Sequence, residues 1–416
     1  MEDALNHTQD NRMDNISLEE GLFRIIQATE PIKDMEEVDL LDGLGRICFE
    51  DVYTTMNQPP FDRSPLDGYA LKAIDSMGAS EDNPIELEVI DSVFAGDYKK
   101  ISVDKGQAVR IMTGAPIPSD CDAVIRQEDT DYGEKKVKLY KSLNAHQNYC
   151  FSGEDYRAGE KIVEKSSILT ADRIGIIASA GVSRLRVKRQ LRVGLLTTGA
   201  ELVMPGDNRP SGKIYNSGFF TLACRLKEMG CQVIPFQSKG DDLAKTCRSI
   251  ETDISRVDVL VTTGGVSVGQ KDIIHPLIQK LGAKKLFWKL KLKPGSPVLV
   301  SLYKGKPIIS LSGNPMAAGV TFELVFNPYY AHVMGCQALM HEKKEAVLVG
   351  TYDKKSPVRR FIKAYSAVDK VYLSRRQIAS GNILSSKDAN CLIDVPSGCN
   401  GLKDGDKVSI IQYRRP

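Results

Sequence analysis

The pattern of apolar and polar residues near the start of the chain predicts a helix. Apolar residues recur at helical spacing over residues 22–26, directly after the capping-box segment 17–20 (Ser-Leu-Glu-Glu). The helix is expected to end near residue 28, because Pro31 cannot continue it. The polar residues 1–16 are expected to form a frayed tail.

Short alternating runs replace this helical period between residues 52 and 149. Runs such as 85–93 and 137–143 are interrupted by Gly, Asp and Pro, and no helical period is sustained. The pattern predicts an inserted, mostly-β domain. On either side of it, residues 17–51 and 150–190 are expected to form one discontinuous linking domain, with a helix over 170–180.

Strands and helices alternate regularly over residues 191–335. Apolar runs at 193–196, 233–236 and 259–261 alternate with amphipathic stretches. These stretches predict helices over 217–229, 242–254, 273–281 and 316–326. The alternation predicts a doubly wound parallel sheet.

The last 81 residues, 336–416, return to short β runs punctuated by glycine. The runs are 346–352, 361–365, 371–374, 391–395 and 407–412. They predict a small β-barrel or sandwich. The fold class expected for the chain is therefore multidomain α/β plus β.

Composition narrows the functional classes. Hydrophobic content of 42% and charged content of 26% are typical of a folded protein, and the net charge of +3 gives no basis for binding nucleic acid. No apolar run approaches the ~20 residues of a membrane span, and the N-terminal segment lacks the pattern of a signal peptide. The nine cysteines include no CxxC pair, which favours free thiols and a cytoplasmic location.

Familiar catalytic motifs are missing from the sequence. The five histidines form no ligand-spaced pair, and there is no HExxH, Walker or GxGxxG motif. These observations argue against zinc and dinucleotide-binding chemistry.

Three glycine-bearing turns each follow an apolar run, and they are the strongest candidates for a binding site. Gly264-Gly265 follows the run 259–261, Pro294-Gly295 follows 288–293, and Gly313-Asn314-Pro315 follows 308–311. Ligands of open α/β sheets bind at the carboxyl ends of strands, where such turns offer backbone N–H groups to an anion.

The run 288–293 (Trp-Lys-Leu-Lys-Leu-Lys) alternates strictly. A regular strand would put Lys289, Lys291 and Lys293 on one face and the apolar residues on the other. These lysines form either a solvated face or a cradle for an oxyanion or phosphate.

Carboxylates follow other strands of the same predicted sheet. Glu201, Asp241, Asp242 and Asp272 lie just past a strand or at the next helix start. They can bind Mg²⁺, which prefers oxygen ligands and usually bridges to phosphates. The alternative for Asp242 and Asp272 is helix N-capping.

The inserted domain carries a rigid polar loop over residues 60–70, which contains Asp67. Thr113 lies in a similar strand-to-turn segment, 109–116. The alternatives are an Asx-turn with a surface ion pair for the first loop and an ordinary turn for the second.

Eight motifs in this order resemble the MoeA family, which includes the E domain of gephyrin and comprises molybdopterin molybdenumtransferases. The matching segments are 60–70, 108–128, 153–155, 198–202, 212–217, 263–269, 287–297 and 313–315. The resemblance implies a homodimer with a MogA-like α/β domain over 191–335. It also implies an inserted mostly-β domain (52–149), an elongated linking and dimerisation domain (17–51 and 150–190) and a C-terminal barrel domain (336–416).

The implied reaction inserts molybdate into adenylyl-molybdopterin and releases AMP, with Mg²⁺ as cofactor. Molybdopterin adenylyltransferase and molybdoenzyme maturation proteins are the implied protein partners. The resemblance assigns catalytic roles to Asp67, Asp155, Glu201, Asp241, Asp272, Lys289 and Lys293, with Glu201 and Asp272 as the metal ligands. Substrate-binding roles fall on Thr113, Thr198, Gly199, Gly264, Gly265, Ser267, Pro294, Gly313, Asn314, Pro315 and Ser380.

The sequence departs from the family pattern at several positions. Ala200 and Gly218 stand where Asp and Asn are usual, Ser312 where Pro is common, and Ala317 where Ser is common. The Arg-x-Glu-Phe-x-Arg pattern becomes Val-Arg-Arg-Phe-Ile-Lys over 358–363. Two alternatives therefore stay open: a non-enzymatic molybdopterin carrier or gephyrin-like scaffold, and a tungsten-inserting paralogue.

Overall fold

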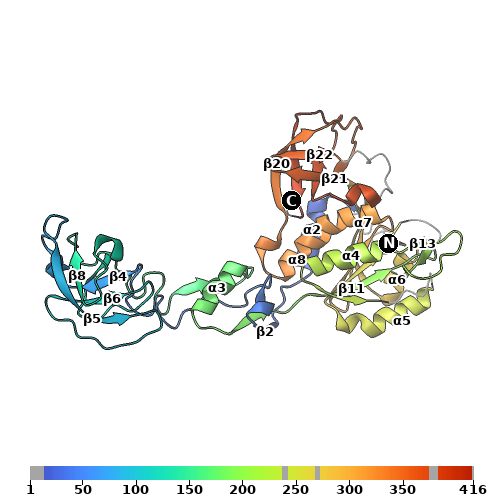
Figure 1. The fold of residues 1–416 in the computed structure, drawn as a ribbon. Coiled ribbons are helices and arrows are strands. Elements are labelled where there is room, and N and C mark those ends of the chain that lie inside the picture. Colours follow the sequence, from blue (N-terminus) through green and yellow to red (C-terminus); the bar gives the residue numbers. More distant parts are fainter. Residues whose placement is uncertain (1–13, 237–241, 268–271, 374–382, 415–416) are drawn as a thin grey trace.

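The computed structural model describes residues 14–236, 242–267, 272–373 and 383–414. The molecule is elongated (Figure 1): a lobe that contains the α/β domain and the C-terminal barrel lies at one end, and the inserted β domain lies at the other. A narrow linking region joins the two ends. No helix in the described ranges is long and apolar enough to cross a membrane.

A seven-stranded sheet forms the centre of the α/β domain. Its strand order is β1 (Asp14–Ile16), β16 (Lys284–Leu290), β18 (Leu299–Tyr303), β19 (Lys306–Leu311), β15 (Val259–Thr263), β11 (Arg192–Thr197) and β14 (Gln232–Pro235). The four strands from β19 to β14 are parallel, as predicted. Strand β18 is antiparallel to both of its neighbours, so the sheet is mixed. The turn Lys304-Gly305, with positive φ at both residues, makes β18 and β19 a hairpin.

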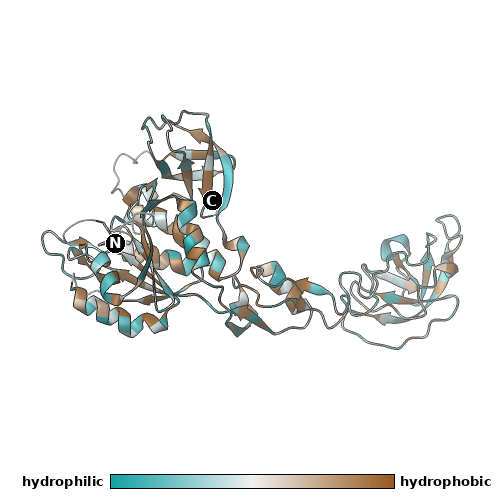
Figure 2. Ribbon diagram, turned by 180° about the vertical axis from the view of Figure 1, so that it is seen from behind, coloured by the Kyte–Doolittle hydropathy of each residue, from teal (hydrophilic) through white to brown (hydrophobic). Residues whose placement is uncertain are grey.

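Helices cover both faces of this sheet, which confirms the doubly wound prediction. One face carries α2 (Leu18–Gln27), α4 (Ser217–Glu228), α7 (Pro315–Thr321), the π-helical η5 (Phe322–Phe326) and α8 (Asn327–Val333). The other face carries α5 (Leu243–Asp253) and α6 (Ile274–Leu281). In Figure 2 apolar colour runs along the strands and alternates with hydrophilic colour along the helices, as amphipathic packing requires.

The N-terminal segment is more ordered than the sequence indicates. The side chain of Ser17 accepts a hydrogen bond from the Glu20 N–H, so the predicted cap of α2 is confirmed. The expectation of a frayed tail is wrong for residues 14–16, because β1 pairs with the edge strand β16. The ion pair between Asp14 and Lys285 (3.4 Å) supports this pairing.

The linking region is built from two small sheets and one helix. Strand β2 (Met35–Asp39) pairs with β10 (Arg184–Lys188), and β3 (Val52–Tyr53) pairs with β9 (Lys161–Val163). Helix α3 (Ala171–Ser179) packs beside them, and Leu185 and Val187 point into their core. Along β10 the exposed Arg184 and Arg186 alternate with the buried Leu185 and Val187.

The inserted domain is a five-stranded sheet with an apolar core on each face. Its strand order is β7 (Ala123–Arg126), β4 (Gly68–Leu71), β6 (Gln107–Ile111), β5 (Ile85–Val93) and β8 (Lys136–Leu139). The prediction of a mostly-β domain is confirmed.

The C-terminal domain is a small closed barrel. Its strands follow the order β17 (Leu292–Lys293), β21 (Arg359–Ala367), β22 (Lys370–Leu373), β20 (Glu342–Val349), β24 (Lys407–Gln412) and β23 (Cys391–Val395). Strand β23 also pairs with β21, which closes the sheet. The nine cysteines are all free thiols, as expected.

Candidate functional site at the carboxyl edge of the sheet

The three glycine-bearing turns meet at the carboxyl edge of the parallel strands. The register places Thr197 opposite Thr263 and Thr263 opposite Leu311, so the chain leaves the sheet at adjacent points. A Cβ on Gly313 would lie 3.2 Å from the Cα of Gly264, which brings two of the turns into direct contact.

The third turn joins them through α7. A Cβ on Gly295 would lie 2.5 Å from the Cγ2 of Thr321 and 3.0 Å from the carbonyl oxygen of Ala317. The turn 294–297 therefore packs against the helix that begins at Pro315.

Gly264 and Gly265 are required by both conformation and space. Their φ angles are +91° and +61°, in the left-handed region that L side chains rarely adopt. A Cβ on Gly264 would lie only 2.3 Å from the carbonyl oxygen of Thr198. The close approach of these backbones leaves a surface of main-chain groups with few side chains, which suits an anionic ligand.

The segments that carry Glu201 and Asp272 converge at Gly265. A Cβ on Gly265 would lie 3.3 Å from the Oγ1 of Thr198 and 3.2 Å from the backbone nitrogen of Ile273. The carboxylate of Glu201 folds back over its own turn, with its oxygens 2.7 and 2.8 Å from the position of a Cβ on Gly199.

The capping alternative holds for only one of the carboxylates. Asp242 caps α5 by accepting a hydrogen bond of 2.9 Å from the Lys245 N–H. The N-cap of α6 is Ile273 rather than Asp272. Asp241 and Ser380 lie outside the described residues.

The donor set fits Mg²⁺ better than a softer metal. No three His, Cys, Asp or Glu side chains of the described segments gather as a metal cage. Glu201 and Asp272 offer only oxygen, and Mg²⁺ is usually held by one or two carboxylates while water and substrate phosphate complete its shell.

The expectation of one continuous lysine-bearing strand is wrong. Lys289 has φ +65°, which breaks the strand alternation, and β16 ends at Leu290. The chain then crosses to the barrel, where Lys293 pairs with Arg360 of β21. The ammonium of Lys289 instead lies 4.0 Å from the centre of the Trp288 ring.

Two asparagines at this edge have structural roles. The Oδ1 of Asn314 accepts hydrogen bonds from the N–H groups of Met316 (3.0 Å) and Ala317 (3.2 Å) and so caps α7. Asn216 caps α4 in the same way, and its Nδ2 donates to the Oγ1 of Thr197 (2.7 Å). These caps fix the starts of both helices beside the turns.

A cavity of about 490 Å³ lies between the α/β domain and the barrel. Lys363 of β21 lines it, and its Nζ donates to the Oγ of Ser386 (3.1 Å) and lies 3.0 Å from the position of a Cβ on Gly319. Burial lowers the pKa of Lys363. In the sequence Lys363 is notable only as a departure from the family motif. Its position within the apolar run 361–365 could have indicated that this lysine is buried.

A buried ionic cluster beside this cavity was missed entirely. The carboxylate of Glu323 in η5 accepts hydrogen bonds from Arg225 (2.8 Å) and lies 2.8 Å from the Nε2 of His341. Burial by itself raises the pKa of Glu323, but the bonds from His341 and Arg225 outweigh it and hold the pKa below its usual range. Arg225 also donates to the carbonyl of Tyr413, so the cluster ties the α/β domain to the barrel.

Asp67 and Thr113 lie far from this edge, in the inserted domain at the other end of the molecule (Figure 1). The Oδ1 of Asp67 accepts hydrogen bonds from both the Oγ1 and the N–H of Thr113, each 2.7 Å long. These bonds hold the pKa of Asp67 below its usual range. Asp155 is exposed where the linking region meets this domain, and its N–H donates to the Gln58 carbonyl.

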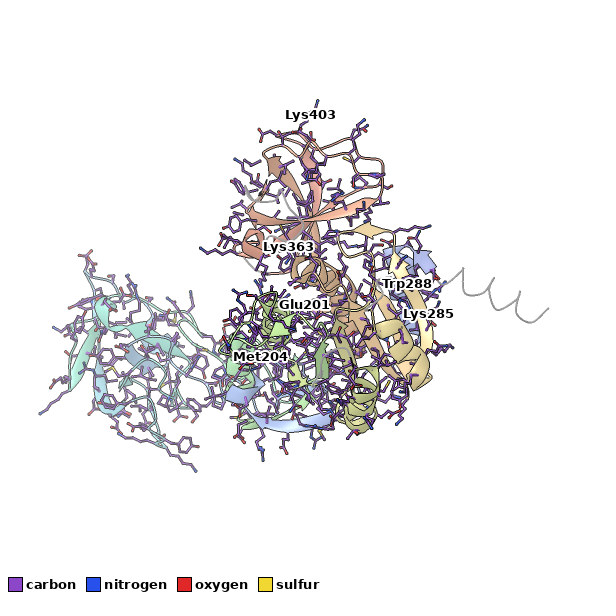
Figure 3. The ribbon with its side chains drawn as sticks, turned by 90° about the vertical axis from the view of Figure 1, so that its right-hand side faces the viewer. Glu201, Met204, Lys285, Trp288, Lys363 and Lys403 are labelled. Atoms are coloured by element: carbon purple, nitrogen blue, oxygen red, sulfur yellow. The ribbon has the colours of Figure 1, made fainter. Side chains whose placement is uncertain are left out.

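Figure 3 shows Glu201, Trp288 and Lys363 in one lobe, and Figure 1 shows the inserted domain at the other end of the molecule. The fold thus brings together the three turns and the segments that carry Glu201 and Asp272, and Lys289 lies beside Trp288, which is bonded to Val266 of one of these turns. The fold does not bring Asp67, Thr113 or Asp155 to these segments within one chain.

Three family models match successive parts of the chain. They are described as the MoeA N-terminal region (domain I and II) over residues 16–181, a probable molybdopterin binding domain over 194–332 and the MoeA C-terminal region (domain IV) over 346–413. The molybdopterin molybdenumtransferase of Staphylococcus epidermidis is 35% identical over 399 residues, which cover 95% of each chain. The enzyme of the same name from Staphylococcus aureus is 32% identical with the same coverage.

Solved structures show the same architecture. The molybdopterin biosynthesis moeA protein of Pyrococcus horikoshii OT3 superimposes with a TM-score of 0.83 at 28% identity, over 96% of this chain and 100% of that one. A molybdenum cofactor biosynthesis protein of Pyrococcus furiosus, 16% identical, shares the fold with a TM-score of 0.60 over 96% of this chain and 100% of that one.

Proposed function

The chain belongs to the MoeA family, and from this premise we propose that it is a molybdopterin molybdenumtransferase, which inserts molybdate into adenylyl-molybdopterin and releases AMP. The observation that carries the proposal is 35% identity to an enzyme of that name over 95% of both chains. The convergence of three glycine-bearing turns at one sheet edge agrees with a substrate that carries phosphate groups.

The backbone groups and the lysines at this edge are proposed to bind different parts of the negatively charged substrates. Backbone N–H groups of the turns at Gly199, Gly265, Ser267 and Gly313 donate to the phosphate oxygens of the substrate. The N–H of Gly264 instead donates to the carbonyl of Leu311 and fixes the turn that presents these donors. The ammonium groups of Lys289 and Lys293 offset the negative charge of the phosphate and of molybdate. Lys363, beside the adjoining cavity, adds a third positive charge on the barrel side.

Glu201 and Asp272 would repel the phosphate by themselves, so they are proposed to hold Mg²⁺. When bound, Mg²⁺ supplies positive charge between these carboxylates and the phosphate. The residues of the chain then hold the adenylate fixed while the oxyanion approaches from the side of Lys289 and Lys293.

The active unit is proposed to be a homodimer. Asp67 and Thr113 are separated from the sheet edge of their own chain by the linking region, so a second copy must supply them if they contact substrate. A cytoplasmic location and contacts with molybdopterin adenylyltransferase and molybdoenzyme maturation proteins complete the proposal.

The test is to supply adenylyl-molybdopterin, molybdate and Mg²⁺ and to measure AMP and molybdenum cofactor. We expect both products from the wild-type protein and neither from Asp272→Ala. Asp242→Ala is the matched control, because Asp242 caps α5 and should affect only stability. A folded wild-type protein that binds molybdopterin and releases no AMP would instead be a carrier.

Competition between tungstate and molybdate in the same assay identifies the metal oxyanion. Preferential insertion of tungsten would assign the chain to a tungsten-inserting paralogue. Such a result would leave the reaction class unchanged.

A further inference from the structure

The single tryptophan of the chain connects two of the three turns. The indole N–H of Trp288 donates to the carbonyl oxygen of Val266, at a distance of 3.2 Å. Val266 directly follows the Gly264-Gly265 pair, so this bond anchors the end of that turn to strand β16. Trp288 itself lies six residues before Pro294, on the strand that leads to the second turn.

Trp288 also holds the side chain of Lys289. Neighbouring residues of a regular strand point to opposite faces, so an aromatic ring and the next residue do not normally meet. Here they meet because Lys289 has φ +65°, a left-handed conformation that a lysine rarely adopts. Its ammonium lies 4.0 Å from the centre of the indole ring, which is the geometry of a cation–π interaction.

The indole is fixed from two further sides. The imidazole of His275, from the first turn of α6, meets it edge-on with ring centres 4.5 Å apart. Within the sheet, Trp288 stands opposite Leu299, Leu299 stands opposite Ser310, and Ser310 stands opposite Thr262. This row crosses the sheet just below the two glycine-bearing turns that follow Thr263 and Leu311.

Stacking fixes the place of the Lys289 ammonium without consuming its donors. An ammonium has three N–H donors, and a ring face interacts with its charge rather than with a particular donor. A lysine held in this way meets an anion with less loss of side-chain freedom than a free lysine, because its ammonium is already in place.

We infer that Trp288 is a positioning residue of the proposed reaction: it holds the Lys289 ammonium and the Gly264–Val266 turn at a fixed separation. The inference rests on the proposed function for its kinetic consequence, while its geometric part stands independently. Trp288 does not itself contact the reacting atoms; it acts through Lys289 and through the carbonyl of Val266.

The chain contains a matched control for this arrangement. Lys304 also has a positive φ (+50°), and its ammonium also stacks on the preceding aromatic residue, Tyr303, at 5.2 Å. This second pair lies in the β18–β19 hairpin, at the opposite edge of the sheet from the turns. It shares the stacking and the backbone strain but not the location.

The kinetic arm compares Trp288→Phe, Trp288→Leu and Tyr303→Leu in the AMP-release assay. Trp288→Leu removes both the ring face and the N–H donor, and we expect kcat to fall by about tenfold or more with a smaller change in KM. Trp288→Phe keeps a ring for Lys289 and should recover part of that loss. Tyr303→Leu should leave kcat unchanged even where it lowers the denaturation midpoint.

The spectroscopic arm uses the protein without substrate. Tryptophan emission of this chain comes from Trp288 alone, so Lys289→Met should shift the emission maximum, whereas Lys304→Met should not. If the wild-type protein releases no AMP but the emission shifts, the proposed function fails and the geometry stands. An unchanged emission in Lys289→Met, or an unchanged kcat in Trp288→Leu with an active wild-type protein, overturns the inference.

Discussion

Different interactions fix the conformation of the three sheet-edge turns and of the loop over residues 60–70, here called the Asp67 loop. At the sheet edge, five buried strand residues (259–263) lead into a turn where a Cβ on Gly264 would lie 2.3 Å from a neighbouring carbonyl. Packing therefore determines that geometry. Asp67 is half-buried, and its carboxylate is held by two hydrogen bonds from Thr113.

This difference in packing indicates which of the two regions is expected to bind a ligand without a partner surface. At the sheet edge the turns and the segments that carry carboxylates pack directly against one another, so the anion site that we propose there is assembled largely within one chain. The Asp67 loop presents one oriented carboxylate on an outer surface, which becomes useful only when another surface meets it. Three predictions test this contrast, in order of decreasing effect.

The largest effect on turnover is expected when the Asp67 loop is inactivated in one chain and the sheet edge is inactivated in the other chain of a dimer. Asp67→Ala and Glu201→Ala should each abolish turnover. If the regions meet across a dimer, a mixed dimer of the two variants contains one intact site, and random mixing should restore about a quarter of the wild-type activity. AMP release from co-expressed variants measures this recovery. No recovery in a verified mixed dimer would mean that the regions do not form a shared site.

A smaller effect is expected from adding one methyl group to a turn. Gly264→Ala introduces both a positive-φ alanine and a collision with Thr198, so we expect a stability loss of roughly 1–3 kcal/mol. Displacement of the turn should lower kcat/KM by about 100-fold. Gly106→Ala in the inserted domain is the control, because φ is +81° there but nothing lies within 4 Å. Equal losses of kcat/KM in both variants would contradict a special role for the packed turn.

The smallest effect concerns the pKa of Asp67. Because Thr113 lowers the folded-state pKa, Asp67 contributes stability above its unfolded pKa, and this contribution is lost as the pH falls through the folded value. Thr113→Val removes the hydroxyl donor and should raise the pKa of Asp67 toward its ordinary value. An NMR titration of the carboxyl carbon measures the shift.

An internal control for that titration lies in the same domain. The carboxylate of Asp120 accepts hydrogen bonds from Ser102 and from the Val103 N–H, which likewise hold its pKa below the usual range. Thr113→Val should leave the pKa of Asp120 unchanged. A changed pKa of Asp120 together with an unchanged pKa of Asp67 would show that the hydroxyl bond from Thr113 does not lower the pKa of Asp67.

Local patterns were sufficient to predict most elements of this fold. The cap of α2, the strands β5, β23 and β24 and the alternation of strands and helices over 191–335 all follow from periodicity and capping, which act over a few residues. The three turns were also visible in the sequence, because glycine directly after a buried strand has few other uses.

Tertiary structure alone decided how these pieces meet. The lysine run was predicted as one strand, but a positive φ at Lys289 and the crossing of Lys293 to the barrel divide it between two sheets. The tail residues 14–16 became a strand only because β16 offers an unpaired edge. The Glu323 cluster with Arg225 and His341 joins residues almost 120 positions apart.

The physical reason is the range of the interactions involved. Capping, alternation and glycine conformation depend on neighbours along the chain, so the sequence by itself determined the elements, the fold class and the turns. Stacking of Lys289 on Trp288, burial of Lys363 and the distance from Asp67 to the sheet edge depend on packing between segments, which only the folded chain determines.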